Sequence, residues 1–495
     1  MAGTVSVSYF HYTATVTLAA GDFGGTRVAD EHSETLTVVP AVPKPTSPPT
    51  PAPVPASPVA VLPLISEGRR THIRWWICGL LFFATTINYV DRAVLGVLAP
   101  TLKSEMGWSD QEYGNINAAF TLAYALGFLF SGWFIDRVGT RIGYAVYLAV
   151  WSLAAAGHSV AHSVVTFSMA RFALGIGESG NFPAAIKTVA EWFPRRERAF
   201  ATGIFNAGSN IGAIVAPALV PVLALSFGWR VAFLITGLAG LTWILFWVPI
   251  YRRPSQHPRV SPAELKLIQS DPPDAHVRMS WLKLLEFHQT WAFVAGKFLT
   301  DSIWWFYLFW FPLFMNEQFK VDLKNIGLPM ITVFLFADVG SISGGWLSSI
   351  LLSRGWSANF ARKTAMLVCA LSILPVALAP RVENAWLAVW LVAIAAAAHQ
   401  GFSANMFTLA SDMFPRRAVG SIVGIGGFAG AIGGFFMSLG AGWLKQNQGG
   451  YTTMFTIAAF AYIVALGIIH VIAPRLEPVE FDHPGLEVDD VSPDR

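Results

Sequence analysis

Charged residues are scarce in this chain of 495 residues. Asp, Glu, Lys and Arg make up 13% of it, whereas an ordinary soluble protein is about 25% charged. Hydrophobic residues reach 54% and aromatic residues 14%. This deficit of charge excludes an ordinary soluble domain and favours a polytopic membrane protein, which has the lipid bilayer as its partner.

Cysteine is nearly absent. Cys78 and Cys369 are the two cysteines of the chain, and each lies in an apolar run. Neither has the spacing of metal ligands, so we expect two buried structural thiols and no metal site. The formal net charge of +3 is spread over loops, so it gives no argument for nucleic acid as a partner.

A signal peptide is not expected, because the first residues lack a basic start, a long apolar centre and a small-residue cleavage site. Ten prolines fall between Pro40 and Pro63. Such a stretch favours extended polyproline and cannot build a core. We therefore expect residues 1–70 to form a disordered, Pro-rich N-terminal tail.

Long apolar segments dominate the rest of the chain. A spanning helix needs about 20 apolar residues, and twelve segments of that length occur, which predicts an all-α membrane protein. They lie near residues 75–100, 113–135, 143–161, 165–189, 199–222, 230–250, 290–315, 327–352, 363–380, 385–411, 419–443 and 452–473.

The two halves of the chain repeat each other. Residues 191–196 read Glu-Trp-Phe-Pro-Arg-Arg after the fourth span, and residues 412–417 read Asp-Met-Phe-Pro-Arg-Arg after the tenth. Parallel repeats of six spans are typical of transporters whose halves rock about a central site. The predicted parts are two six-helix bundles at 71–250 and 289–475, a central loop at 251–288 and a C-terminal tail at 476–495.

Arg and Lys close to the span ends are distributed unequally. They favour the side of the termini and the central loop by sixteen to six. Because cytoplasmic loops carry the excess of Lys and Arg, this bias predicts that both termini and the central loop are cytoplasmic. In a bacterium the membrane would be the inner one.

The first span contains two opposite charges, Asp91 and Arg92, where lipid would demand none. An intramembrane charge costs roughly 2.5 to 3.5 kcal/mol, so such charges pair, face a water-filled cavity, or move an ion or substrate. A snorkelling pair at a helix end is the alternative. Since the arginine fork makes two parallel hydrogen bonds, Arg92 suits a substrate carboxylate.

The fourth span has the same peculiarity, with Arg171 and Glu178 seven residues apart. Seven helical residues make nearly two turns and rise about 10.5 Å, so the two side chains share a face. Burial favours the neutral carboxyl group and a nearby arginine favours the charged one, so Glu178 is able to change protonation as a cavity opens to either side. A purely structural pair is the alternative. These charges favour an anionic substrate carried with protons.

Other polar side chains lie inside the spans. Lys297 and Asp301, one turn apart, either belong to the site or simply neutralise each other. Trp305 belongs to an aromatic run that fits the apolar face of a sugar ring, although an interfacial aromatic belt is the commoner role. The remaining polar positions are Tyr124, Asn206, Asn210, His399, Gln400, Ser403 and Asn405.

His399 occupies a repeated position. It lies sixteen residues before Pro415, as Glu178 lies sixteen residues before Pro194. The repeat therefore predicts that His399 faces Glu178 across the cavity. A satisfied core histidine is the alternative.

The turn between the second and third spans combines an acid, glycines and basic residues. Asp136, Arg137, Gly139 and Arg141 suit a tight cytoplasmic turn that locks against a neighbouring helix. We expect this turn to act as a gate and not as a substrate site.

The motif Gly-x-x-x-Asp-Arg-x-Gly-x-Arg at 132–141, with twelve spans in two halves, resembles the major facilitator superfamily over residues 70–475. Residues 88–92 with 171–178 resemble its anion:cation symporter family of organic-anion carriers. The runs at 297–307 and 399–405 are most similar to the hexuronate transporters, which import glucuronate and galacturonate with protons.

This resemblance implies roles for the deep charges. Asp91 and Glu178 would be the proton-carrying acids. Arg92 would hold the substrate carboxylate, and Arg171 would partner Glu178.

Two further positions, Tyr124 and Asn210, match cavity positions of that family. The second half departs from the pattern, because Ser349 stands where an acid is usual. This departure affects the expected strength of the second gate and not the resemblance to the family.

The leading hypothesis is a monomeric, proton-coupled hexuronate symporter without a cofactor. The nearest alternative carries galactonate, glucarate, tartrate or phthalate. A membrane anion sensor is a rival of another class, but no catalytic or phospho-acceptor module is visible in the central loop or tail. An enzyme is disfavoured, because the deep charges include no nucleophile–base set and no metal ligands.

Overall fold

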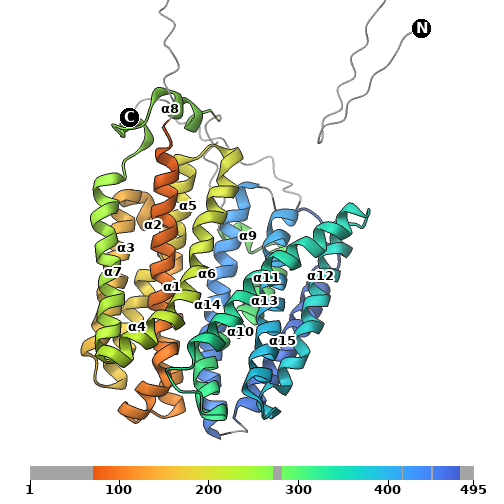
Figure 1. Cartoon of the computed structure of the whole chain (residues 1–495). Coiled ribbons are helices and arrows are strands. Elements are labelled where there is room, and N and C mark those ends of the chain that lie inside the picture. The colour runs from red at the N-terminus through yellow and green to blue at the C-terminus, as the bar shows by residue number, and fades with distance from the viewer. Residues whose placement is uncertain (1–70, 271–280, 415, 448–449, 480–495) are drawn as a thin grey trace, which may run out of the picture. The chain divides into compact units, whose positions relative to one another are not determined.

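The computed structural model describes residues 71–270, 281–414, 416–447 and 450–479. The predicted tail at 1–70 lies outside the described residues, as do ten residues of the central loop and most of the predicted C-terminal tail. The described chain is built from helices packed side by side (Figure 1).

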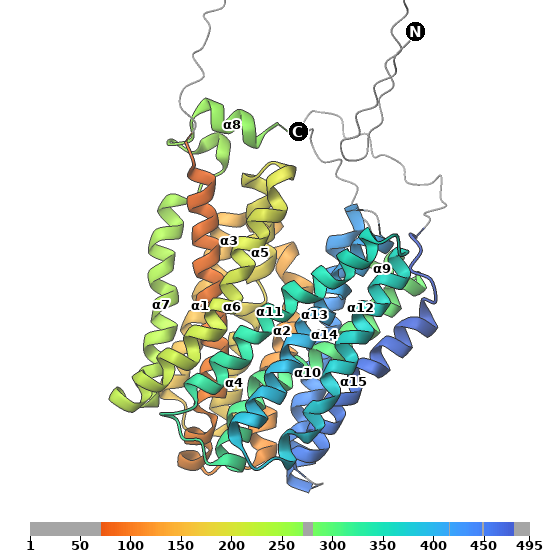
Figure 2. The same ribbon diagram turned by 45° about the vertical axis from the view of Figure 1, so that its right-hand side comes forward.

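The helices of the first half lie together, and those of the second half lie beside them (Figure 2). The first half contains α1 (Ile73–Met106), α2 (Asp110–Val138), α3 (Thr140–Gly157), α4 (Val164–Glu178), α5 (Asn181–Trp192), α6 (Arg195–Phe227) and α7 (Trp229–Ile250). The second contains α10 (His288–Phe319), α11 (Gly327–Ser353), α12 (Ala358–Ile373), α13 (Ala385–Met413), α14 (Arg416–Asn447) and α15 (Tyr451–Ile472). The central segment carries α8 (Pro262–Ile268) and α9 (Trp281–Leu284), and short 3-10 turns lie at η1 (His158–Val160), η2 (Pro254–Gln256) and η3 (Leu374–Arg381).

Each of the twelve predicted spans coincides with a helix or a pair of helical pieces. Within the described ranges, nine helical segments are long and apolar enough to cross a membrane. The third, fourth and seventh spans are outside these nine. The fourth is divided between α4 and α5, of 15 and 12 residues, and the seventh, α10, carries Lys297 and Asp301.

The break in the fourth span is a difference from the single helix predicted at 165–189. The helix ends at Glu178 and restarts at Asn181. Pro183 has no backbone N–H, so it cannot donate to the carbonyl of Ser179, four residues earlier. Gly180 lies against the ring of Tyr147, where a Cβ would approach to 2.2 Å. The break therefore follows from a proline and a close packing contact.

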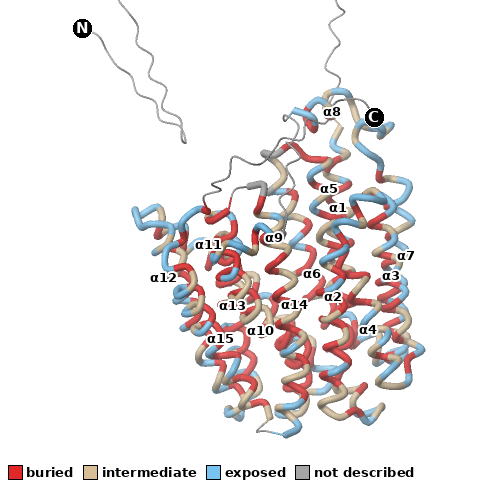
Figure 3. The backbone as a smooth tube through the Cα atoms, turned by 180° about the vertical axis from the view of Figure 1, so that it is seen from behind, coloured by how far each residue is buried: buried red, intermediate tan, exposed pale blue. Residues whose placement is uncertain are grey.

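Exposed apolar side chains mark the outer faces of the helices. Figure 3 shows buried positions where helices face one another and exposed positions on the outside of α7 and α12. Phe246 on α7 and Leu367 on α12 are 56% and 43% exposed. An apolar surface of this kind fits the hydrocarbon core of a bilayer.

Helices of the first half pack along helices of the second. α2 packs along α14, α1 along α10, and α6 along α11. Gly114 permits the first approach, because a Cβ there would lie 2.6 Å from the carbonyl oxygen of Ser438. Small residues allow helix backbones to come close in membranes.

The start of α1 is capped by the central segment. No side chain of α1 caps its own N-terminus. The buried Glu264 of α8 instead accepts the backbone N–H groups of Ile73 and Arg74, both at 3.2 Å, and the Arg74 guanidinium at 3.0 Å. A carboxylate stabilises a helix N-terminus through its free N–H groups and dipole. The central segment is thereby tied to the first half.

Gly175 sets the distance between α4 and α2. A Cβ at this position would lie 2.4 Å from the carbonyl oxygen of Phe120 and 3.0 Å from the amide nitrogen of Tyr124. We expect Gly175→Ala to destabilise the protein by about 1–3 kcal/mol through overpacking, seen as a lower melting temperature in detergent. Gly203→Ala is the control, because nothing lies within 4 Å of a Cβ there. Equal melting temperatures for both variants would contradict the prediction.

Candidate functional site

Arg92 of α1 and Glu178 of α4 form a buried ion pair. The Arg92 Nε donates to Glu178 Oε2 at 2.7 Å, and the two side chains are 4% and 0% exposed. Arg92 also donates to Asn88 Oδ1 at 3.3 Å. Losing one partner of a buried pair is strongly destabilising, because it leaves an uncompensated charge. A ligand that takes Arg92 from Glu178 must therefore also resolve the charge on Glu178.

Aromatic rings surround the Arg92 guanidinium. Its central carbon lies 4.5 Å from the ring centre of Tyr89, 4.8 Å from Tyr124, 5.3 Å from Trp305 and 5.6 Å from Phe120. Trp305 belongs to α10 of the second half, and the other three rings to the first. The attraction between a cation and an aromatic face is stronger when water is excluded from the contact. Arg92 therefore lies where the two halves meet.

Arg171 does not pair with Glu178 as the sequence led us to expect. Its two terminal nitrogens donate to the backbone carbonyl of Arg92, at 3.3 and 3.4 Å. The guanidinium lies over Phe120 at 5.3 Å. Arg171 of α4 thus reaches a backbone carbonyl of α1, while the Arg92 side chain of α1 reaches Glu178. Arg171 thereby holds the backbone of the residue that pairs with the acid.

Asp91 is 2% exposed. Within the described ranges, neither of its carboxyl oxygens has a hydrogen-bond partner. Thr236 of α7 is its polar neighbour, but the Thr236 hydroxyl donates to the carbonyl of Phe233 at 3.3 Å. A buried carboxylate without partners is costly when it is charged and much less so when it is protonated.

Asn210 and Tyr89 line a small cavity between the halves. Tyr124 of α2 is stacked on Phe120 with ring centres 5.9 Å apart and lies edge-on to Trp305 at the same distance. The predicted residues Tyr124, Trp305 and Asn210 are thus brought to the junction that contains Arg92.

His399, Ser403 and Asn405 lie on α13 among second-half partners. His399 Nδ1 lies 2.6 Å from the hydroxyl of Tyr462, and its ring stacks on Trp304 at 4.8 Å. The Asn405 amide donates to the carbonyls of two helices, α11 at 3.0 Å and its own at 2.9 Å. Ser403 is buried, at 7% exposure. The predicted position of His399 opposite Glu178 stays a prediction.

Lys297 and Asp301 bind each other. The Lys297 Nζ lies 2.7 Å from Asp301 Oδ2, so the two charges form an ion pair one turn apart on α10. Gly430 of α14 packs directly against Asp301, since a Cβ there would lie 2.3 Å from its carboxylate.

The predicted gate turn makes contacts within its own half. Asp136 pairs with Lys187 of α5 at 2.7 Å. Arg141 donates to the Val248 carbonyl of α7 at 2.8 and 2.5 Å. Gly139 joins α2 to α3 with φ of 90°, a backbone conformation that favours glycine. Arg137 lies over Trp133 at 5.9 Å.

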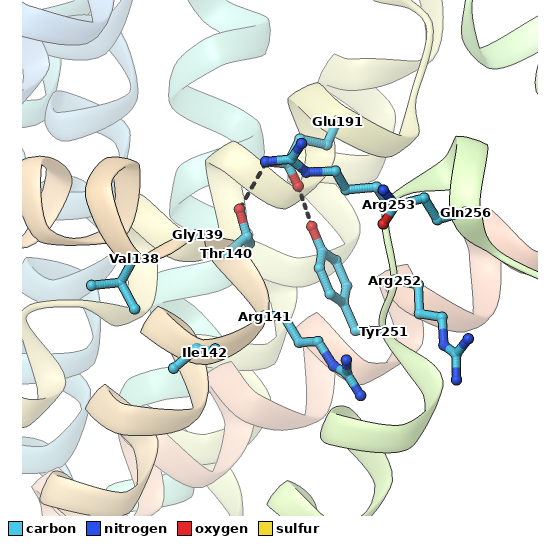
Figure 4. A pocket seen from close by; sticks show the side chains of 10 residues that line it. All are labelled: Val138, Gly139, Thr140, Arg141, Ile142, Glu191, Tyr251, Arg252, Arg253 and Gln256. Carbon is cyan, nitrogen blue, oxygen red and sulfur yellow. Dashed lines mark hydrogen bonds between the residues drawn. The ribbon is translucent and has the colours of Figure 1, made fainter.

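A cavity borders this turn (Figure 4). Thr140 donates to Glu191 at 2.8 Å, and the Tyr251 hydroxyl donates to the same carboxylate. Glu191 is the acid of the first-half repeat motif, so it ties the start of α3 to the chain after α7. The lining residues are Val138, Gly139, Thr140, Arg141, Ile142, Glu191, Tyr251, Arg252, Arg253 and Gln256.

In the second half, the acid of the repeat motif binds an arginine instead of hydroxyl groups. Asp412, the acid of the second repeat motif, binds Arg362 of α12 at 3.1 Å. Arg362 also donates to Ser348 at 2.8 Å, whereas the Ser349 hydroxyl donates to the Gly345 carbonyl of its own helix at 2.9 Å. The repeat acid therefore has a partner in both halves, although the turn acid is replaced by serine in the second.

Four charges from both halves meet at the end remote from the central segment. Lys103 and Asp110 come from the first half, and Glu317 and Lys445 from the second. Lys103 binds Glu317 at 3.0 Å, and Lys445 binds Asp110 and Glu317 at 2.5 Å each. Tyr451 donates to Glu317 at 2.9 Å. These residues, here named the remote-end cluster, join the halves at that end.

Sequence reasoning missed the remote-end cluster and two other groups. Lys103 and Lys445 were visible only as charges near span ends, and their partners lie far away in the sequence. Asp338, a single acid within an apolar span, gave the same signal as Asp91 and was overlooked. The sequence around Glu264 did not indicate a function. Its role in capping α1 depends on the residue at which that helix begins.

Comparison with known proteins agrees with this arrangement. Residues 81–438 match the family model of the Major Facilitator Superfamily. The chain is 31% identical over 420 residues to the hexuronate transporter of Escherichia coli K12, covering 83% of this chain and 97% of that one. It is 36% identical over 280 residues to the galacturonate transporter of Dickeya chrysanthemi, covering 56% and 81%.

A solved structure shares the fold. A bacterial homologue of the human lysosomal transporter Spinster, in an inward-facing and occupied conformation, superposes with a TM-score of 0.64 at 18% identity, covering 82% of this chain and 96% of that one. The chain therefore belongs to the major facilitator superfamily, as a multi-pass membrane transporter and not an enzyme.

Proposed function

We propose that this protein imports a sugar-acid anion together with protons, and that the anion is a hexuronate such as glucuronate or galacturonate. The buried pair of Arg92 and Glu178 at the junction of the halves carries the proposal. The names of the relatives support the substrate class, and the rocking of two halves about a central site is the mechanism that suits the fold.

Coupling follows from the charges. A substrate carboxylate that binds the Arg92 fork competes with Glu178 for the same nitrogens. Once displaced, Glu178 is a buried carboxylate without its cation, and taking up a proton removes that cost. Within the described part of the chain, the buried Asp91 carboxyl has no hydrogen-bond partner. It would carry a second proton. Substrate and proton would thus enter the site together.

The proposed setting is a bacterial inner membrane, with both termini in the cytoplasm and the protein as a monomer. The excess of Lys and Arg on that side supports the orientation. Asp136, Arg137, Gly139 and Arg141 would form the cytoplasmic gate. His399, Ser403 and Asn405 would supply polar contacts from the second half, with Arg171, Tyr124, Trp305 and Asn210 completing the substrate site.

A second candidate is another sugar acid. It is favoured by a D-galactonate transporter of Escherichia coli O6:H1, 31% identical over 416 residues and covering 81% of this chain and 95% of that one. Galactonate has the same single carboxylate and a chain of hydroxyl groups, so the same arginine could hold it.

Uptake into proteoliposomes tests the proposal. Labelled glucuronate and galacturonate are supplied with and without an inward proton gradient, and we expect accumulation above the external concentration only with the gradient. Liposomes without protein and a protonophore provide the controls. Uptake of neither hexuronate by folded protein would reject that substrate and leave galactonate as the next to be tested.

A further inference from the structure

Asp338 is a charged residue that the function described so far does not use. It lies near the middle of α11, in a span that is otherwise free of charge. It is half-buried, and none of the hydrogen bonds and ion pairs found among the described residues involves its carboxylate. A carboxylate kept at membrane depth without a partner calls for a role.

Asp338 lines the small cavity between the two halves. The polar residues around the cavity are Ser209 and Asn210 of α6 and Gln400 of α13. Its walls also include Tyr89 of α1. Asp338 and Gln400 belong to the second half, and the other polar residues belong to the first. A molecule held there would contact both halves.

The cavity is next to the arginine site. Tyr89 lines the cavity. The Arg92 guanidinium carbon lies 4.5 Å from the centre of the Tyr89 ring. Trp304, another wall residue, stacks on His399. A cavity of about 40 Å³ has room for water, whose share of liquid volume is about 30 Å³, but not for a sugar acid. The substrate would occupy it when α6 and α11 separate.

The two sides of this region differ in charge. Arg92 offers a fork for one carboxylate, whereas Asp338 offers acceptors for hydroxyl groups and repels a second carboxylate. Asn210, Gln400 and Ser209 donate and accept hydrogen bonds, which also suits hydroxyl groups. This set fits a molecule with a single carboxylate at one end and hydroxyl groups at the other.

We propose that Asp338 is a specificity-determining residue that selects sugar acids with one carboxylate over those with two. It accepts hydrogen bonds from the hydroxyl end of the substrate and excludes the second carboxylate of an aldaric acid. The inference rests on the proposed sugar-acid function. It narrows the substrate class to hexuronates and aldonates, and it rejects glucarate and galactarate.

Galactonate and galactarate make a matched pair for the test, because they differ only at C6, which is a CH₂OH group in one and a carboxylate in the other. Each is used as a competitor of labelled glucuronate uptake in proteoliposomes. For the native protein we expect galactarate to inhibit at least tenfold less well than galactonate. For Asp338→Asn the ratio should fall by at least tenfold, because the repulsion between the Asp338 carboxylate and the second carboxylate of galactarate is removed.

Two variants serve as controls. Asp338→Glu keeps the charge and should keep the native ratio. Asp322→Asn removes the same charge from the exposed segment before α11, and it should also keep the ratio. An unchanged ratio in Asp338→Asn, or equal inhibition of the native protein by both acids, would overturn the inference. The native measurement stands even if Asp338→Asn fails to fold.

The measurements on the native protein also distinguish failure of the proposed function from failure of the role of Asp338. If the native protein takes up no sugar acid, the proposed function falls and the inference with it. If it takes up glucuronate but does not distinguish galactonate from galactarate, the function stands and the role of Asp338 falls.

Discussion

Replacing Glu178 with glutamine should abolish accumulation driven by a proton gradient and preserve counterflow exchange. Glutamine has nearly the same size, and its amide oxygen can still accept the 2.7 Å hydrogen bond from Arg92. It cannot bind or release a proton, so substrate would bind and return without coupling. We expect the ratio of internal to external substrate to fall to about one, measured with labelled hexuronate in proteoliposomes under an inward proton gradient.

Glu383→Gln is the control for this variant, because Glu383 is exposed and loses the same charge. It should accumulate substrate as the native protein does. If Glu178→Gln accumulates substrate normally, Glu178 is not a coupling residue. Loss of both accumulation and exchange would instead indicate that Glu178 holds the site together.

Replacing Arg92 with lysine should weaken substrate binding strongly. Lysine keeps the charge but not the fork, so it cannot make two parallel hydrogen bonds to a carboxylate. Charge-assisted hydrogen bonds contribute about 1.5–3 kcal/mol each. Losing roughly 2 kcal/mol would weaken binding about 30-fold, measured by competition for labelled substrate with purified protein.

Arg381→Lys is the matched control, since Arg381 is exposed and donates to the Ala377 carbonyl of its own helical turn. Its substrate affinity should equal that of the native protein. Unchanged affinity in Arg92→Lys would remove Arg92 from the substrate site and leave Arg171 as the candidate anion holder.

The membrane-spanning helices could be predicted from the sequence, because the hydrocarbon core of a bilayer tolerates few polar side chains. The same scarcity made Asp91, Arg92, Arg171 and Glu178 conspicuous. Which arginine meets Glu178 was not readable, since spacing along one helix says nothing of the distance to another. Arg171 and Glu178 share a helix, but the arginine that binds Glu178 is Arg92 of another helix, α1.

The break in the fourth span was in principle readable from Pro183, which follows Gly180 closely. A long apolar run nevertheless favoured one uninterrupted helix. Asp338 was missed for a different reason. It lacks a repeated counterpart such as the one that drew attention to His399, and its setting depends on α6, a helix of the other half.

The remote-end cluster has a consequence for how the carrier meets its surroundings. If that end faces the periplasm, the barrier to the first encounter with substrate consists of ion pairs between Lys103, Glu317, Lys445 and Asp110. The side chains of this cluster are only 9–30% exposed, and mobile ions screen partly buried pairs in direct contact much less than they screen well-separated exposed charges. Opening at that end would then require these ion pairs to separate, and its frequency would depend little on the salinity of the medium.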